Sequence, residues 1–332
     1  MSLTTPKAST YQFDQATLTT LLGNTSTGST WYTGHASKDW AIGNVPNGGR
    51  CYVVSLILDA VLQHYSQRYQ KHPVALNCYF FGKTLPGSFI VEIEELKTSG
   101  KGYCICRAVL KQYKDIDHPL PTAEALDDDT LISKVHGIFT LGNMSAESGR
   151  THLYNNPSAP SRDTMIPTRY TFMGDFVNAK VDPSTFPRST KTGEPIMHRP
   201  FAGVDETDEV IPGRPELSQA MSFADGRPID LKSLAYWSDM FITPPALLGS
   251  TFWNGSVWCP TMQLEVQFKR IPKTHEILAH FAVPHLINNR FDLNGELFDA
   301  DGNVLAVTRH QCLVVDWSRN MATKGAAVPA KI

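Results

Sequence analysis

Hydrophobic residues in the N-terminal half recur first with helical spacing and then in four shorter, strand-like runs. Residues 48–69 predict one strong helix, opened by Asn47, Gly48 and Gly49. Turn-forming residues or polar loops separate the runs that follow, as is typical of strands joined by hairpins. These strands are predicted over residues 73–81, 87–96, 102–113 and 130–142.

The C-terminal half repeats this order. Residues 231–243 predict a helix, and Asp301 with Gly302 forms a hairpin signal between the last two of four strands. The strands are predicted over residues 261–270, 275–283, 289–299 and 303–315. One helix followed by four strands, twice, indicates an internal duplication. The expected fold is α+β: two antiparallel sheets, each wrapped around a helix and joined edge to edge into one continuous sheet, which removes exposed strand edges.

A stretch rich in Ser, Thr, Pro and Asn separates the two halves and is predicted to be a connection, not a third domain. The expected organisation is an N-terminal unit over residues 1–142, a connection over 143–195, a C-terminal unit over 196–318 and a flexible tail over 319–332.

Composition narrows the possible functions. The 332 residues carry a formal net charge of −2 without a basic stripe, which disfavours nucleic-acid binding. No apolar run approaches the ~20 residues of a membrane span, so none is expected. The six cysteines form no Cys-x-x-Cys pair, and the histidines lack a carboxylate or thiol pattern. We therefore expect free thiols, no disulfide framework, no metal site and no cofactor.

Asp239 is the least expected residue of the second predicted helix. Asp230 can cap this helix and the proline pair 244–245 can end it, while the residues between are apolar on nearly all sides. Such a helix belongs in a core, where a carboxylate is costly unless it is hydrogen-bonded or has a function. From this helix alone, a structural role for Asp239 as a cap or pairing partner is favoured.

Two more polar residues stand out in the C-terminal strands. Strand alternation places Gln311 on the more apolar, inward face of its strand and His310 on the opposite face. A structural glutamine bonded to the backbone is the simpler interpretation of Gln311. The same alternation places Thr261 on the polar face of its strand, although strands that begin after proline are often irregular.

Three segments of the C-terminal half resemble the double-hotdog acyl-CoA thioesterases of the thioesterase II type. They are "YWSDMFITPPAL" (236–247), "TMQLEVQFKR" (261–270) and "DADGNVLAVTRHQCLV" (299–314), in the family's order and with similar intervals. The resemblance implies the double-hotdog fold and assigns the family's catalytic aspartate, threonine and glutamine to Asp239, Thr261 and Gln311. The neighbouring residues Trp237, His310 and Cys312 depart from the family's pattern.

The resemblance implies hydrolysis of acyl-CoA, or of a related acyl thioester, to a free acid and a thiol. Asp239 would act as general base on a water that Thr261 and Gln311 orient, without an acyl-enzyme intermediate. Gly48 and Gly49 resemble the start of the first hotdog helix and are candidates for the oxyanion site. Close packing of helix on sheet explains this glycine pair equally well.

Tyr236 and Trp237, beside the aspartate, join Gly48 and Gly49 as candidate substrate-binding residues. Two alternatives to hydrolysis stay open on the same fold: an acyl-thioester dehydratase or isomerase, and a non-catalytic acyl-binding protein. A homo-oligomer is compatible with the sequence. The final residues Ala330, Lys331 and Ile332 follow the small-basic-aliphatic pattern of a peroxisomal address, with a cytoplasmic location as the alternative.

Overall fold

The computed structural model describes residues 9–40, 50–114, 130–153, 158–170, 173–197 and 210–321. Three features predicted from the sequence lie outside these ranges: the glycine pair Gly48 and Gly49, most of the C-terminal tail, and the tripeptide that ends it. Within the described part of the chain, no helix is both long enough and apolar enough to cross a membrane.

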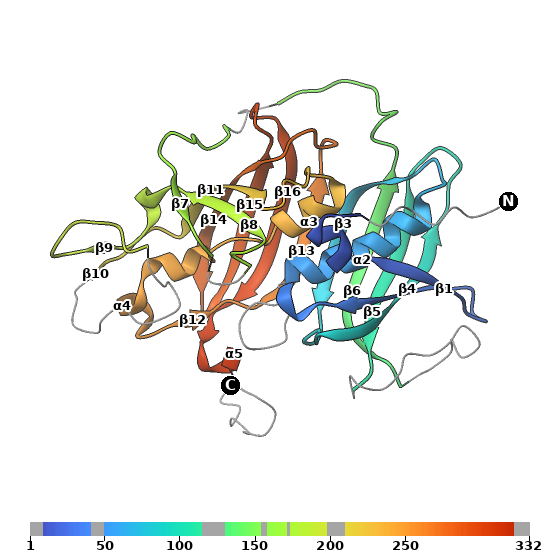
Figure 1. Ribbon diagram of the computed structural model, residues 1–332, viewed down its shortest axis with the longest axis horizontal. Helices are drawn as coiled ribbons and strands as arrows, with labels where there is room; N and C mark the ends of the chain where they lie inside the picture. Colours follow the sequence, from blue (N-terminus) through green and yellow to red (C-terminus); the bar gives the residue numbers. More distant parts are fainter. Residues whose placement is uncertain are drawn as a thin grey trace.

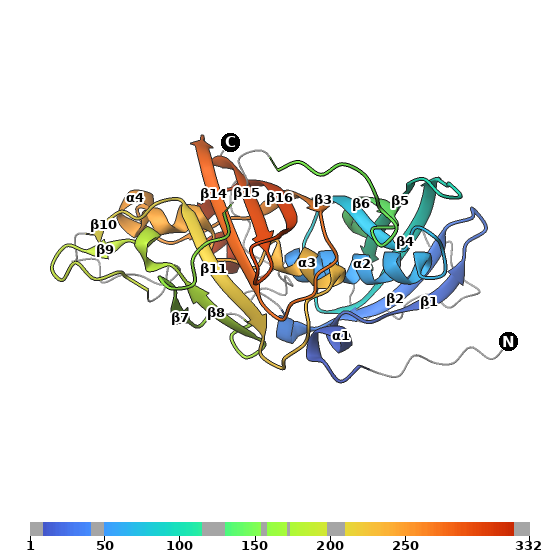
Figure 2. The ribbon, with the colours of Figure 1, turned by 90° about the horizontal axis from the view of Figure 1, so that it is seen from above.

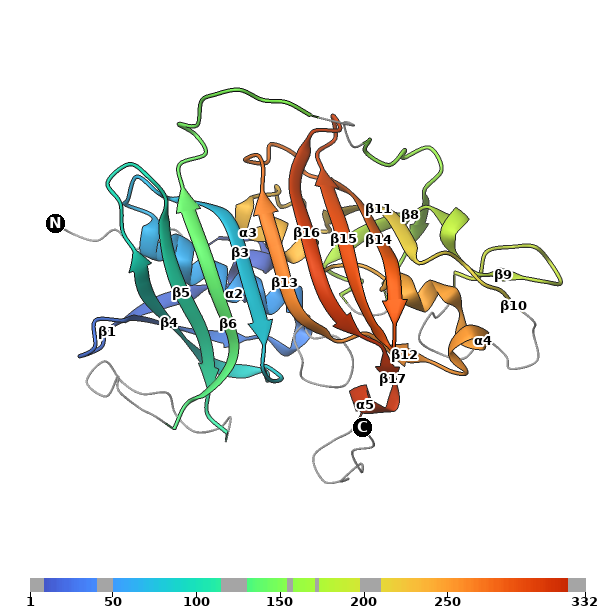
Figure 3. The same ribbon diagram turned by 180° about the vertical axis from the view of Figure 1, so that it is seen from behind.

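One antiparallel sheet of 13 strands organises the described residues, in the order β1-β2-β4-β5-β6-β3-β13-β16-β15-β14-β11-β8-β7 (Figures 1 and 3). Its N-terminal strands are β1 Thr19–Asn24, β2 Thr30–Ala36, β3 His72–Phe80, β4 Gly87–Lys97, β5 Cys104–Gln112 and β6 Ile132–Gly142. Its C-terminal strands are β7 Ile166–Thr168, β8 Val177–Val181, β11 Glu216–Phe223, β13 Thr261–Phe268, β14 Ile277–Ile287, β15 Arg290–Phe298 and β16 Val304–Leu313.

The two halves follow the same plan. In each, two strands lead into a helix and four strands follow: β1, β2, α2 (Arg50–Tyr65) and β3–β6 in the first half, β8, β11, α3 (Leu231–Trp237) and β13–β16 in the second. Outward from the junction, β3-β6-β5-β4-β2-β1 mirrors β13-β16-β15-β14-β11-β8. The predicted internal duplication and continuous antiparallel sheet are confirmed, as are the eight predicted strands.

The sequence prediction missed the two strands that precede each helix. In the second half these strands are β8 and β11. β8 and the additional edge strand β7 lie inside residues 143–195, which were predicted to be a connection. Both strands extend the sheet, because β8 pairs with β11 and β7 pairs with β8. The strand pattern of β8 is only five residues long and lies among prolines and polar residues, so its alternation carries little signal.

The junction between the halves is an antiparallel pairing of β3 with β13. Leu264 lies opposite Cys78, and Val266 lies opposite Leu76, so the inward side chains of the two strands form one continuous apolar surface. Edge-to-edge pairing satisfies the backbone groups that each half would otherwise expose at an edge strand.

The helices α2 and α3 pack against each other on the inner side of this sheet (Figure 2). From Tyr52 onward, most side chains of α2 are buried, as expected for a helix with few polar positions. The five-residue helix α1 (Gln12–Ala16) inserts Phe13 into the same core, where its ring contacts Tyr236 of α3 with centroids 5.3 Å apart. The hydrophobic core therefore runs through both halves.

Smaller elements surround the second half. They are the paired strands β9 Arg188–Ser189 and β10 Val210–Ile211, the paired strands β12 Val257–Trp258 and β17 Val315–Asp316, the short helices α4 Ser250–Trp253 and α5 Ser318–Met321, and the 3-10 turns η2 Pro183–Thr185 and η3 Pro244–Leu248. A further 3-10 turn, η1 Lys38–Trp40, follows β2 in the first half.

Candidate active site

The helix that precedes Asp239 is much shorter than its sequence pattern predicts. Asp230 caps α3 by accepting a hydrogen bond from the backbone N–H of Ser233, whose hydroxyl oxygen accepts one from the backbone N–H of Asp230. The helix ends at Trp237, although the pattern predicts a helix to residue 243. Asp239 therefore lies on the chain that leaves the helix, and the prediction that it lies within the helix is wrong.

Side chains from two strands explain why the chain leaves the helical path here. The carbonyl of Ser238 lies 3.1 Å from Nε2 of His310 on β16, and the carbonyl of Met240 accepts a 2.7 Å hydrogen bond from Nε2 of Gln219 on β11. Tyr170 donates its hydroxyl hydrogen to Oε1 of Gln219. Burial raises the pKa of Tyr170, so this hydroxyl stays a donor across the physiological range. Both residues flanking Asp239 are thus fixed by buried partners.

The structure reverses the sides predicted for His310 and Gln311. His310 is fully buried, whereas Gln311 is exposed. The inward face of β16 carries Ala306, Thr308, His310 and Cys312. The prediction failed because Val307 and Leu313, which are partly buried on the outer face, make that face look like the apolar one. Gln311 therefore does not join Asp239 and Thr261.

His310 takes the inward position instead and faces Asp239. Its Nδ1 lies 3.4 Å from Oδ1 of Asp239, and the Asp239 side chain keeps 11% of its surface exposed. The ring of Phe241 meets the imidazole edge-on, with centroids 5.5 Å apart. The imidazole is thus enclosed, while the carboxylate beside it reaches the solvent.

Thr261 lies on the inner face because β13 is irregular at its start. The pairing of β13 with β16 shifts register between Thr261 and Gln263, so Thr261 lies opposite Cys312. Such a β-bulge turns the first residue to the other face. The thiol of Cys312 lies 3.6 Å from Oγ1 of Thr261, which is 6% exposed. The position that strand alternation assigned to Thr261, on the polar face, is wrong.

The inner ends of α3, β13 and β16 therefore bring together a carboxylate, an imidazole, a hydroxyl and a thiol. His310 and Cys312 are alternate residues of one strand, about 7 Å apart at the strand rise. The pair of Asp239 with His310 and the pair of Thr261 with Cys312 are therefore neighbours along β16. Burial raises the pKa of the nearby Cys259 well above its usual value, so that thiol is not a nucleophilic thiolate. Carboxylate, imidazole and hydroxyl together are suited to holding a water and moving its proton.

The other candidate residues have different surroundings. Tyr236 and Trp237 have no exposed surface and pack with Phe223 in the aromatic core behind Asp239. In the structure they support the helix from within the core, and their role in substrate binding stays a prediction.

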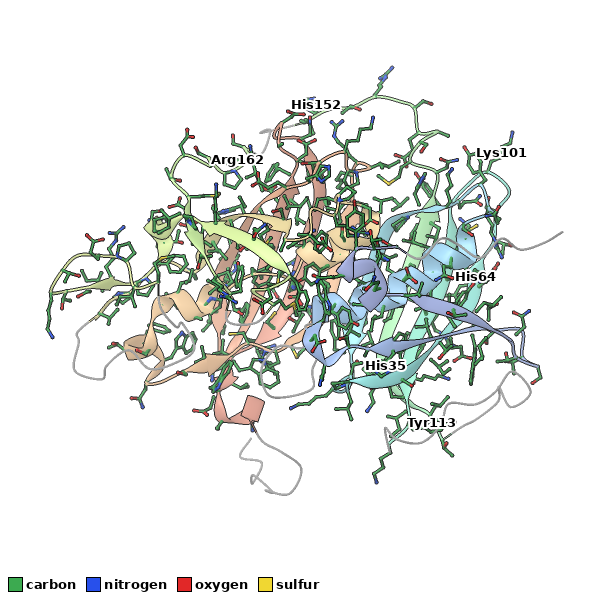
Figure 4. The ribbon with its side chains drawn as sticks, in the orientation of Figure 1. His35, His64, Lys101, Tyr113, His152 and Arg162 are labelled. Carbon is green, nitrogen blue, oxygen red and sulfur yellow. The ribbon has the colours of Figure 1, made fainter. Side chains whose placement is uncertain are left out.

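Three of the other described histidines come from separate parts of the fold. Figure 4 shows His35, His64 and His152 well separated from one another. Among the described residues, no group of three or more His, Cys, Asp or Glu side chains is placed to hold a metal ion.

Two family models match the chain, one in each half. Residues 36–126 match the model of the acyl-CoA thioesterase N-terminal domain, and residues 168–314 match that of the acyl-CoA thioesterase C-terminal domain. A search of curated proteins finds no match.

Three solved structures share the fold across most of the chain. A protein described as a thioesterase II from Thermobifida fusca is 17% identical, with 92% of this chain and 98% of that chain covered and a TM-score of 0.67. A hot dog protein from Alicyclobacillus acidocaldarius is 17% identical, with 92% and 99% covered and a TM-score of 0.66. An acyl-CoA thioesterase II from Mycobacterium marinum is 13% identical, with 92% and 98% covered and a TM-score of 0.62.

Proposed function

Since the chain belongs to the acyl-CoA thioesterase family, with that family's N-terminal and C-terminal domains in order, we propose that it hydrolyses acyl-CoA to a free acid and CoA. The observation that supports this most directly is the place of Asp239. A carboxylate at the edge of an apolar core, fixed on both sides and still in contact with solvent, can orient a water toward a bound thioester.

We assign roles to two of the residues predicted from the sequence. Asp239 accepts a hydrogen bond from the hydrolytic water and so positions it, and the hydroxyl of Thr261 orients the same water from β13. Gln311 has no part in this proposal, because it lies on the outer face of β16. Attack by water on the thioester carbon then releases the thiol without an acyl-enzyme.

The test is release of free thiol from a panel of acyl-CoA substrates that differ in chain length and branching. Wild-type protein should turn over at least one of them, and Asp239→Asn should abolish most of that turnover while the protein stays folded. Asp292→Asn is a matched control, because Asp292 is an exposed carboxylate paired with Arg309. Equal activity of Asp239→Asn and Asp292→Asn would contradict the proposed site.

The alternatives give different products. A dehydratase would convert a 3-hydroxyacyl-CoA to an enoyl-CoA without releasing thiol, and an acyl-binding protein would retain acyl-CoA unchanged. Product analysis of the same panel by mass spectrometry separates these outcomes from hydrolysis.

A further inference from the structure

We propose that His310 accepts the proton of the hydrolytic water, with Asp239 as its electrostatic partner, so that an imidazole–carboxylate pair is the base of this enzyme. This inference rests on the proposed hydrolysis and deepens it. It is carried by a hydrogen-bonding pattern that fixes which nitrogen of His310 bears the proton.

Nε2 of His310 has two oxygen neighbours at 3.1 Å: the carbonyl of Ser238 and the hydroxyl of Thr308. Thr308 donates its only hydroxyl hydrogen to the carbonyl of Glu265, at 2.7 Å. Both oxygens facing Nε2 therefore accept hydrogen bonds. Nε2 must carry the hydrogen, because in a neutral imidazole one ring nitrogen donates and the other accepts.

Nδ1 of His310 is then left with a lone pair. It is buried, makes no hydrogen bond with any described residue, and lies 3.4 Å from the carboxylate of Asp239. Two acceptors facing each other repel unless a donor joins them. A water can donate one hydrogen to each, which leaves its lone pairs free for attack on a carbonyl carbon. Asp239 is the more exposed of the two residues, so the water would enter from its side.

The water oxygen forms a bond to the thioester carbon while one O–H bond breaks, and its proton passes to Nδ1. The carbonyl electron pair moves to oxygen and returns as the C–S bond breaks. The imidazolium then gives its proton to the departing thiolate, and His310 returns to the neutral form. The carboxylate of Asp239 stabilises the transient imidazolium, since opposite charges at this separation attract strongly away from bulk water.

His310→Gln tests this role against a purely structural one. A glutamine amide can replace Nε2 as donor to the carbonyl of Ser238, but it has no group that can take a proton at the position of Nδ1. We expect kcat to fall by about 10²-fold or more, with little change in KM and a melting temperature close to that of the wild type. Near-normal kcat in folded His310→Gln would overturn the proposal.

His280→Gln is the matched control. His280 also lies on a strand of the second half, but its Nδ1 contacts the hydroxyl of Ser218 on the outer side of the sheet. We expect its kcat to stay within about two-fold of the wild-type value, as for substitutions away from buried networks. A loss in His280→Gln equal to that in His310→Gln would also overturn the proposal, because it would show a general effect of removing a strand histidine.

The proton position itself can be measured without turnover. In full-length protein labelled with ¹⁵N-histidine, long-range ¹H–¹⁵N spectra report which ring nitrogen is protonated, and His310→Gln identifies the His310 signals. We expect the ring proton on Nε2, as the two acceptors around that nitrogen require. A proton on Nδ1, alone or in a doubly protonated ring, would overturn the inference. Absence of thiol release by the wild-type protein would instead overturn the proposed function, and the two failures are therefore distinguishable.

Discussion

The two halves of the molecule share a backbone plan but differ at the positions that line the inner end of the sheet. In both, the strand after the helix begins with a register shift: between Pro73 and Ala75 in β3, and between Thr261 and Gln263 in β13. The shifts align the two strands residue by residue. Pro73 in the first half thus corresponds to Thr261 in the second.

The neighbouring strands extend this correspondence. Phe139 of β6 takes the place of His310 in β16, and Leu141 takes that of Cys312. Both residues of β6 are buried in the apolar core. Where the second half has hydroxyl, imidazole and thiol groups, the first half has a proline ring, a phenyl ring and a leucine.

The helices of the two halves also differ, in their length and in the segment that follows them. The 16-residue helix α2 is followed by β3 after six residues, whereas the seven-residue helix α3 is followed by a long segment before β13. Because α3 ends at Trp237, Asp239 lies on the non-helical chain that follows it. One copy of the duplicated unit therefore has core residues at these positions, and the other has the polar groups to which we assign the chemistry.

Asp239→Asn should have the largest effect on turnover, because it removes the carboxylate proposed to act in the second half. The substitution keeps the shape and hydrogen-bonding capacity of the side chain, so the melting temperature should change little. It removes the negative charge that orients the water and stabilises the imidazolium, and we expect turnover to fall by ~10²–10⁴-fold. Thiol release and thermal unfolding of the same preparations measure both quantities. Asp239→Asn combined with His310→Gln should lose far less than the product of the single losses, because the residues act as a unit.

Exchanging the equivalent residues of β6 and β16 should separate core from chemistry. Phe139→His places an imidazole among apolar side chains, and we expect it to lower the free energy of unfolding by about 3 kcal/mol without directly affecting the chemistry. His310→Phe should abolish turnover but cost only about 1–2 kcal/mol, for the lost hydrogen bond to the Ser238 carbonyl. Denaturant unfolding and thiol release measure the pair. A larger stability loss in His310→Phe than in Phe139→His would contradict this comparison.

The strands could be predicted from the sequence, whereas the end of α3 and the inward face of β16 could not. The eight strands after the two helices carry clear alternation and turn signals, and the structure confirms them. The end of α3 depends on tertiary hydrogen bonds to the Ser238 and Met240 carbonyls, which no local pattern encodes. The alternation in β16 was misleading because both faces are partly apolar. The buried Thr308 and Cys312, in phase with His310, are the signal that could have identified the inward face.

Thr261→Val should have a smaller effect, because it removes only a hydroxyl that orients the water. Valine has nearly the same shape and suits a strand position that is buried. We expect kcat to fall by about 10-fold, the order of one lost hydrogen bond in the transition state. Thr192→Val, at an exposed threonine, is the control and should leave kcat unchanged. Unaltered kcat in Thr261→Val would exclude its hydroxyl from the reaction.

The smallest expected effect concerns the ion pairs that join the two halves. Lys232 of α3 bonds Asp59 of α2 at 3.0 Å, and Arg227 bonds Asp14 of α1 at 2.7 Å. Burial on its own raises the pKa of Asp14, but the hydrogen bond from Arg227 and the charge of Lys232 outweigh it and hold this pKa below the usual 3.8. Asp14 therefore stabilises the fold above its unfolded pKa, and the contribution is lost as pH falls through the folded one.

Asp14→Asn should accordingly lower stability at neutral pH by about 1–2 kcal/mol. The difference from wild type should shrink as the pH is lowered below about 4, because the wild-type carboxyl then becomes protonated too. Melting temperatures from pH 7 to pH 3 measure this convergence. Asp175→Asn is the control, since Asp175 pairs with Arg169 while 82% of its side chain stays exposed, and such a pair contributes little. A constant difference across that pH range would show that the Asp14 carboxylate does not couple the two halves through its charge.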